Sequence, residues 1–280
     1  MNAPSAMSAS SLFDLHDRTA VVTGAMGLLG KEHCRALASA GARIVATDLD
    51  TGSALSFAEE LRARGASGVL MMDADVTSPE SLLALRDAAL EQFGALDVLV
   101  NNAAIDDKVE LPATALEESR FEQYALRRWR RALDVNVTGV FLASQILGTE
   151  MAKAGRGSIV NVASTYGVVA PDQALYRTPQ GEQTFFKSPV YPTSKGAVLS
   201  FTRYLAAYWG DAGVRVNALS PGGVQNGQDA HFVASYSSRT LLGRMARPDD
   251  YRGALLFLAS DASAYVTGTN LIVDGGWTAK

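Results

Sequence analysis

Short runs of apolar, largely β-branched residues recur along this chain, each separated from the next by a stretch with helical character. The runs are continuously apolar rather than alternating, which is typical of parallel strands that helices cover on both faces. Strands and helices in alternation form βαβ units, and right-handed crossovers wind such units into one sheet. The pattern therefore predicts an α/β fold with a doubly wound parallel sheet and helices on both of its faces.

The boundaries of these segments can be read from the sequence. The expected strands are Ala20–Thr23, Arg43–Thr47, Gly68–Met72, Val98–Asn101, Ser158–Val162, Val214–Leu219 and Asn270–Val273. The expected helices are Leu28–Ala40, Ala54–Arg64, Ser78–Phe93, a long one near Glu117–Lys153, Val190–Tyr208 and Pro248–Ser260. Since no linker or repeat divides the chain, we expect a single domain over residues 12–280, preceded by a disordered tail over residues 1–11.

Composition excludes several classes of protein. The 280 residues are 48% hydrophobic and 19% charged, which excludes a disordered chain. The net charge is −4, so a nucleic-acid partner is not expected, and the one basic run, Arg127–Arg131, is interpreted first as a solvated helix face and second as an anion site. A lone cysteine and three scattered histidines predict no disulfide and no metal. Without an apolar span or a secretory signal, we expect no membrane contact and a cytoplasmic location.

A glycine-rich turn follows the first expected strand. Residues 24–30 read Gly-Ala-Met-Gly-Leu-Leu-Gly and lead into a helix. Glycines there allow a tight turn and a close approach of the backbone, and the helix N-terminus offers N–H groups to a pyrophosphate. Asp48, at the end of the second strand, is suited to accept both hydroxyls of an adenosine ribose and to repel a 2′-phosphate, although a turn or N-cap role is the alternative. This pattern predicts an NAD site.

Further motifs follow in a fixed order along the chain. They are Asp75-Val76-Thr77, Asn101-Asn102-Ala103-Ala104, Asn136 in Asp134–Val137, Ser164 in Asn161–Ser164, Tyr191-Pro192-Thr193-Ser194-Lys195, Ser220–Val224, Tyr265–Gly268 and Val273–Gly276. With these motifs, the chain from Leu15 to Trp277 resembles the short-chain dehydrogenase/reductase family. The resemblance implies a Rossmann-type sheet of about seven strands, hydride transfer between an alcohol or ketone and a nicotinamide cofactor, and a homotetramer.

Four residues are the expected catalytic set. Tyr191 and Lys195 are four apart, so they share a helix face, and a nearby ammonium should lower the pKa of the phenol toward the working pH. Tyr191 would then exchange a proton with the substrate oxygen, which Ser164 would polarise. The resemblance implies that Lys195 also holds the nicotinamide ribose and that Asn136 holds a water linking Lys195 to solvent.

The expected cofactor contacts come from several segments. They are Gly24, Met26, Gly27, Leu28, Leu29, Gly30, Asp48, Asp75, Val76, Asn102, Tyr191, Lys195, Pro221, Gly222 and Val224. Asp75 and Asn102 have an alternative role as caps of nearby backbone. Two other functions stay open: a cofactor-sensing regulator, against which the intact catalytic residues argue, and a nucleotide-sugar epimerase or dehydratase. The latter is suggested by Gly27, which gives the glycine spacing of the family's extended branch, but such enzymes usually carry a further C-terminal domain.

Two stretches are long for the family. Ile105–Arg128 lengthens the connection before Asn136, and Pro171–Lys187 lies between Ser164 and Tyr191. Because both ends of the second stretch join catalytic residues, we expect it to line the substrate pocket, with a surface insertion or oligomer contact as the alternative. Its aromatic residues would cover a ring or exclude water: Tyr176, Phe185 and Phe186. Its polar residues would bind the hydroxyls of a sugar or polyol: Gln173, Arg177, Gln180, Glu182, Gln183 and Lys187.

Overall fold

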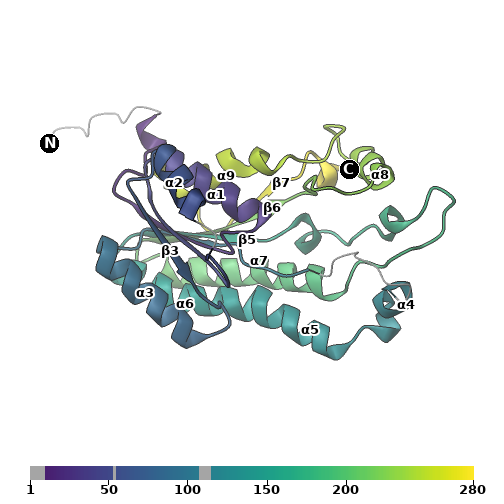
Figure 1. Ribbon diagram of the computed structural model, residues 1–280, viewed down its shortest axis with the longest axis horizontal. Coiled ribbons are helices and arrows are strands. Elements are labelled where there is room, and N and C mark those ends of the chain that lie inside the picture. The colour runs from purple at the N-terminus through teal and green to yellow at the C-terminus, as the bar shows by residue number, and fades with distance from the viewer. Residues whose placement is uncertain (1–9, 53–54, 107–114) are drawn as a thin grey trace.

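Seven parallel strands form one sheet in the computed structural model, which describes residues 10–52, 55–106 and 115–280 (Figure 1). The strand order is β3-β2-β1-β4-β5-β6-β7, which is the doubly wound arrangement expected from the sequence. The strands are β1 Thr19–Thr23, β2 Arg43–Asp48, β3 Gly68–Asp73, β4 Val98–Asn101, β5 Gly157–Val162, β6 Val214–Pro221 and β7 Asn270–Val273. The tail expected to be disordered falls, for residues 1–9, outside the described residues, whereas Ser11 begins a 3-10 turn that ends at Phe13.

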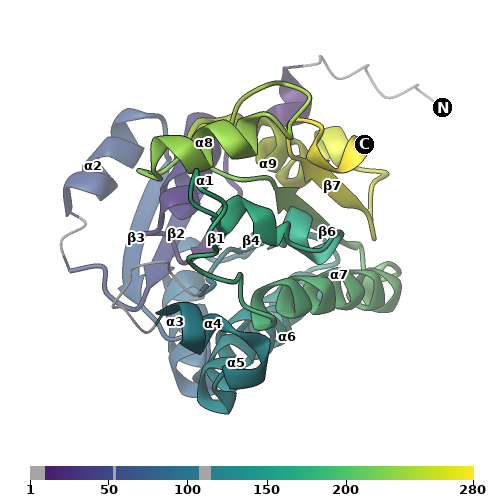
Figure 2. The same cartoon turned by 90° about the vertical axis from the view of Figure 1, so that its right-hand side faces the viewer.

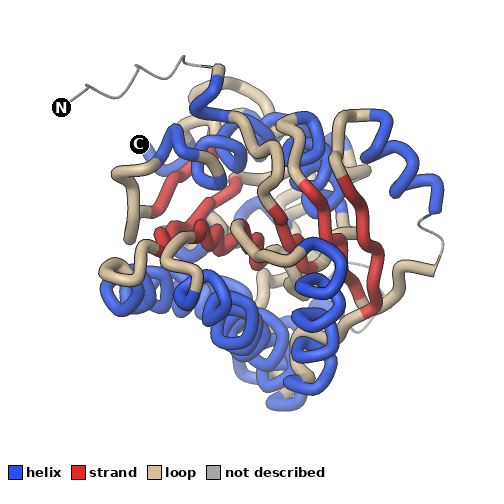
Figure 3. The backbone as a smooth tube through the Cα atoms, turned by 90° about the vertical axis from the view of Figure 1, so that its left-hand side faces the viewer, coloured by secondary structure: helices blue, strands red, loops and turns tan. Residues whose placement is uncertain are grey.

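Helices cover both faces of this sheet, as Figure 3 shows with strands in red between two layers of helix. One layer contains α1 Leu28–Ser39, α2 Leu55–Ala63 and α9 Arg252–Ala259, and the other contains α3 Pro79–Phe93, α6 Gly139–Lys153 and α7 Val190–Trp209. Successive residues of β1 alternate between the layers: Val22 packs with the α1 layer and Val21 with the α6 layer. Both faces are therefore buried, which explains why the strands are continuously apolar.

The long helix expected over Glu117–Lys153 is wrong, because the structure divides it. The segment forms α4 Ala115–Ser119, a 3-10 turn, α5 Leu126–Leu133, a π-helical turn at Asp134–Thr138 and then α6. The backbone is extended at Arg120, Tyr124 and Ala125, which interrupts the helix between α4 and α5. The structure also contains a helix that was not expected, α8 Ala230–Ser237, which begins where the Asp229 side chain accepts a hydrogen bond from the Phe232 amide at 2.9 Å.

The carboxyl ends of the strands meet at one end of the molecule, which Figure 2 shows facing the viewer. The chain leaves β1 toward β2 on one side, whereas β4 lies on the other side of β1. Ligands of doubly wound sheets bind at such a switch point, outside the carboxyl ends of the strands. The loops after β4 and β5 and the helix α8 surround this end, which identifies the place to look for a site.

Candidate active site

The glycine-rich turn joins β1 to α1 at this switch point. Gly24 has φ +62°, and a Cβ there would lie 2.8 Å from the Ala103 Cα on the neighbouring loop. A Cβ on Gly30 would lie 2.1 Å from the Gly24 carbonyl oxygen, so the turn excludes any side chain at that position. Gly27 precedes the helix without a side-chain cap, which leaves the first amides of α1 available to a ligand. The turn thus forms a cradle that fits a pyrophosphate.

A cavity of about 380 Å³ opens beside this turn. It is lined by Gly24, Gly27, Leu28, Leu29, Asp48, Asp75, Val76 and Asn102, which are eight of the expected cofactor residues. Met26 and Gly30 do not line it: Gly30 is buried beneath the turn, and the Met26 amide donates to the Asp48 carboxylate at 2.9 Å. The other Asp48 oxygen accepts from the Leu49 amide at 2.8 Å, so Asp48 both faces the cavity and fixes the turn.

The side chains of Asp75 and Asn102 form hydrogen bonds with nearby backbone groups, as the alternative capping role predicted. The Asp75 carboxylate accepts from the amide and hydroxyl of Thr77 at 2.8 and 2.7 Å. The Asn102 amide nitrogen donates to the carbonyl oxygens of Thr23 and Gly24 at 3.0 and 2.9 Å. Since both residues also line the cavity, the capping role and the expected cofactor role are compatible. Arg131, from the basic run, lies on the wall of the same cavity.

A second cavity, of about 350 Å³, continues from the first, with which it shares Leu29, Asn102 and Ala104. Six further residues expected at the site line it: Ser164, Tyr191, Lys195, Pro221, Gly222 and Val224. Ser164 follows β5, and Tyr191 and Lys195 lie in the first turns of α7, so two separate segments bring a hydroxyl, a phenol and an amine to one space. The two cavities together extend from the glycine-rich turn to these three side chains.

Burial shifts the pKa values of Tyr191 and Lys195 in opposite directions. Lys195 Nζ donates to the Val162 carbonyl oxygen at 2.8 Å and lies 5.7 Å from the centroid of the Tyr191 ring. Burial and the charge of Asp106 raise the pKa of the Tyr191 phenol, while a hydrogen bond with Ser164 lowers it. The expected activation of this phenol by the Lys195 ammonium stays a prediction. Burial also lowers the pKa of Lys195 to about 8.

Asn136 lies inside the π-helical turn and is completely buried, so it does not reach either cavity. Its side-chain oxygen accepts from the Ile105 amide at 2.8 Å, and its nitrogen donates to the Ile105 carbonyl at 2.9 Å. The same nitrogen donates to the Ser194 hydroxyl at 3.1 Å, next to Lys195. Asn136 therefore fixes the loop after β4 against the catalytic helix, and the water expected there stays a prediction.

The stretch Pro171–Lys187 contributes Tyr176 and Lys187 to the catalytic cavity. Its other residues expected to bind substrate do not line this cavity: Gln173, Arg177, Gln180, Glu182, Gln183, Phe185 and Phe186. Arg177 and Gln183 pair across a small hairpin, and Phe185 is buried against Tyr176, with ring centroids 5.6 Å apart. The insertion therefore reaches the cavity through two side chains, while Arg177, Gln183 and Phe185 contact other residues of the insertion itself.

Sequence reasoning missed most of the opposite wall. One missed lining residue is Tyr166, which follows β5. Four others lie in or near α8: Gln228, Phe232, Tyr236 and Met245. Tyr236 is nearly buried, and its hydroxyl accepts from the Gly223 amide at 2.6 Å. The N-cap motif at Asp229 was the available sequence signal for this helix. Asp106, in the loop after β4, was missed as well, and it forms an ion pair with Lys187.

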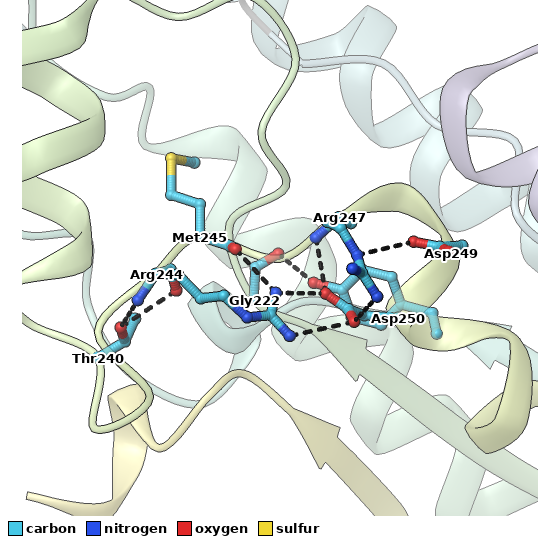
Figure 4. A network of polar contacts seen from close by, with 8 residues as sticks. Gly222, Thr240, Arg244, Met245, Arg247, Asp249 and Asp250 are labelled. Carbon is cyan, nitrogen blue, oxygen red and sulfur yellow. Dashed lines mark hydrogen bonds and ion pairs between the residues drawn. The ribbon is translucent and has the colours of Figure 1, made fainter.

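A polar network holds the segment that leads from this wall to α9 (Figure 4). The Arg244 guanidinium donates to the Met245 carbonyl at 3.1 Å and to both Asp250 oxygens at 2.6 and 3.1 Å. Asp250 also accepts from the Arg247 amide at 2.7 Å, while the hydroxyl of Tyr251 donates to the Gly222 carbonyl at 3.1 Å. Gly222 and Met245, from opposite ends of the loop, are thus both anchored at the start of α9.

Residues 10–52, 55–106 and 115–280 contain no group of three or more histidine, cysteine, aspartate or glutamate side chains arranged to hold a metal ion. Within the same ranges, no helix combines the length and apolar character that a membrane crossing requires.

Comparisons with known proteins agree with this arrangement. Residues 24–278 match the family model described as enoyl-(acyl carrier protein) reductase. The chain is 38% identical over 267 residues to cis-4-hydroxycyclohexanecarboxylate dehydrogenase of Sinomonas cyclohexanicum, covering 94% of this chain and 97% of that enzyme. It is 36% identical over 274 residues to D-threitol dehydrogenase of Mycolicibacterium smegmatis, covering 96% and 95%.

Solved structures are similar over nearly the whole chain. A short-chain type dehydrogenase/reductase from Mycobacterium marinum has a TM-score of 0.83 at 32% identity, covering 98% of this chain and 100% of that one. A gluconate 5-dehydrogenase from Burkholderia cenocepacia, in complex with NADP and tartrate, has a TM-score of 0.84 at 31% identity, with the same coverage.

Proposed function

The chain belongs to the short-chain dehydrogenase/reductase family, and we propose that it interconverts a secondary alcohol and a ketone with NAD as its cofactor. The observation that carries the proposal is the convergence of Ser164, Tyr191 and Lys195 on a cavity continuous with a nucleotide-sized cleft. This arrangement argues against a regulator that only senses a cofactor, because such a protein has no use for an acid beside the nicotinamide end of the cleft.

The residues present fit a nicotinamide dinucleotide. A side chain at Gly24 or Gly30 would fill the cradle of the turn, because its Cβ would lie within 2.8 Å or 2.1 Å of neighbouring backbone atoms. Asp48 supports NAD over NADP, because a half-buried carboxylate is suited to bind ribose hydroxyls and repels a 2′-phosphate. The Burkholderia enzyme was crystallised with NADP, so the preference is a property to be measured for this chain.

The chemistry proposed for the protein is proton transfer at the substrate oxygen. A bound nicotinamide supplies or accepts the hydride. Ser164 donates a hydrogen bond to the substrate oxygen, and Tyr191 gives that oxygen its proton in ketone reduction. In alcohol oxidation the phenolate takes the proton back, so the pKa raised by burial predicts that oxidation gains and reduction loses rate as pH rises. Lys195, whose Nζ donates to the Val162 carbonyl oxygen, is proposed to bind the nicotinamide ribose.

The substrate we propose is a small hydroxylated molecule such as a sugar or polyol derivative. The cavity is small, and its wall combines phenols with an ion pair at Lys187, which suits a compact polar molecule better than a large apolar one. Relatives named for polyols and for hydroxylated acids support the same size and polarity.

A homotetramer is proposed for the assembly. Aromatic side chains form an exposed stack on α7, where the rings of Tyr204 and Tyr208 lie 6.0 Å apart and are 62% and 67% exposed. Phe141 of α6 adjoins this stack through Phe201. An apolar face of this kind marks an interface.

The proposed activity is tested with a panel of alcohols and ketones, each with NAD and NADP, followed at the absorbance of the reduced nicotinamide. Tyr191→Phe should abolish nearly all turnover and leave the Kd of NADH unchanged, because only the hydroxyl is removed. Tyr204→Phe, an exposed tyrosine of the same helix, is the matched control. Substantial turnover by the Tyr191→Phe enzyme would assign the proton transfer to another group.

A further inference from the structure

The catalytic cavity contains charged groups that the proposed reaction does not use. Lys187 and Asp106 form an ion pair on its wall, and their side chains are only 11% and 32% exposed. The Lys187 ammonium lies 4.8 Å from the centroid of the Tyr191 ring, closer than the ammonium of Lys195 at 5.7 Å. The pair therefore adjoins the position where the reacting oxygen would bind.

Both partners are fixed through their backbone. Asp106 follows Ile105, whose amide and carbonyl are both bound by the Asn136 side chain. The backbone of Lys187 is held in the same way, because its amide donates to the Gln173 side-chain oxygen at 2.8 Å and its carbonyl accepts from the Gln173 nitrogen at 3.3 Å. Because both partners are already fixed, binding a ligand to this ion pair requires little further loss of side-chain conformational entropy.

The chemistry of the pair selects among neutral, anionic and apolar ligands. A hydroxyl both donates and accepts, so one substrate hydroxyl can donate to Asp106 while it accepts from Lys187. A carboxylate would have to compete with Asp106 for the same ammonium and would meet a like charge. An alkyl group would desolvate both charges and give no hydrogen bond in return.

We propose that the Asp106–Lys187 ion pair is the specificity-determining element of this enzyme and that it binds a substrate hydroxyl other than the one being oxidised. The inference rests on the proposed function, because it uses the same cavity, and it assigns the enzyme to polyhydroxylated rather than carboxylated or simple alcohols. Neither residue takes part in the proton transfer.

Three four-carbon probes separate these classes: threitol with a hydroxyl on every carbon, 2-butanol with one hydroxyl, and 3-hydroxybutanoate with a carboxylate. Both enantiomers of each are assayed for kcat and KM with NAD and with NADP. Because a hydrogen bond to a charged group is worth roughly 10- to 100-fold in binding, Asp106→Asn and Lys187→Met should each lower kcat/KM for threitol by that factor, mainly through KM. Turnover of 2-butanol, measured for each enzyme on the plateau of its pH profile, should change by less than about threefold, since this alcohol has no second hydroxyl for the pair to bind.

The control is Lys153→Met, which removes a lysine that is ion-paired with Glu150 at 2.9 Å in the last turn of α6. The double variant should have a kcat/KM for threitol no lower than that of the single variant with the larger loss, because both residues bind one hydroxyl. An unchanged Kd for NADH shows that the variants are folded.

Several results would overturn the proposal. A wild-type preference for 3-hydroxybutanoate over threitol would assign Lys187 to a carboxylate, and equal losses on threitol and 2-butanol would give the pair a merely structural role. Melting temperatures with each probe are measured beside turnover. If the wild-type protein oxidises no probe yet threitol raises its melting temperature and not that of the variants, the proposed reaction fails and the hydroxyl site stands. If threitol raises neither, the site fails as well.

Discussion

Replacing Asp48 with asparagine tests how the chain selects its cofactor. The change keeps the shape of the side chain and removes its negative charge. The carboxylate accepts from two amides, those of Met26 and Leu49, and an asparagine has only one acceptor oxygen. We therefore expect the variant to keep a weakened turn, to bind NAD somewhat less well, and to lose its discrimination against NADP.

The size of the expected cofactor preference follows from the position of Asp48 on the wall of the cavity beside the glycine-rich turn. The carboxylate is half-buried, between the dielectric environments of a protein surface and of water. For a phosphate with about two negative charges at about 5 Å, an effective dielectric constant of about 40 gives roughly 3 kcal/mol of repulsion. That corresponds to a preference for NAD of about 100-fold, which Asp48→Asn should largely abolish. Arg131, also at this cavity, is exposed, so solvent screens its attraction for a phosphate.

The assay is the ratio of kcat/KM for NAD to that for NADP, measured at two salt concentrations with one substrate. Asp50→Asn is the matched control, because Asp50 is exposed, binds the Gly52 amide at 2.8 Å and does not line the cavity. A wild-type preference for NADP, or an equal fall with both cofactors in the Asp48→Asn enzyme, would refute the reasoning.

Three further predictions concern the wall of the cavity, its charges and the assembly. Replacing residues 173–186 with a short Gly-Ser turn removes Tyr176 from the wall, so kcat/KM for the substrate should fall sharply while NAD affinity stays nearly unchanged; full retained kcat/KM would remove the loop from the substrate site. Asp106→Asn should move the acid limb of the pH profile for oxidation of 2-butanol to lower pH, because the Asp106 charge raises the pKa of Tyr191, and an unmoved profile would contradict this. Light scattering at micromolar concentration should give a tetramer that Tyr204→Glu dissociates, whereas a wild-type monomer would exclude the proposed interface.

The strands of the sheet could be predicted because the residues that identify each strand are contiguous in the sequence. The central strands β1 and β4 are buried throughout and therefore read as continuous apolar runs, and Val98–Asn101 was delimited correctly from that pattern alone. The glycine-rich turn and the order of the motifs likewise lie in contiguous segments. Eight residues that line the cavity beside the glycine-rich turn could therefore be named from the sequence.

The errors arise where distant segments decide the outcome. The residues from Glu117 to Lys153 are mostly good helix formers, and nothing local marks the break before α5 or the π-helical turn. That turn contains Asn136, whose side chain is bound by the loop at Ile105, 31 positions away. Asp106 escaped notice because its partner Lys187 is 81 positions further along the chain. Similarly, α8 is stabilised by Tyr236 stacking on Trp277, with ring centroids 4.3 Å apart.

The two stretches that are long for the family are fastened to each other. The Phe186 amide donates to the buried Ser119 hydroxyl at 3.0 Å, the Arg120 guanidinium lies 5.6 Å from the centroid of the Phe186 ring, and Lys187 pairs with Asp106. A chimera that receives only one of these stretches from a relative would leave Ser119 or the Phe186 amide without its counterpart. Because these contacts couple the two stretches, an engineered change of substrate range that grafts this part of the molecule should exchange both stretches at once.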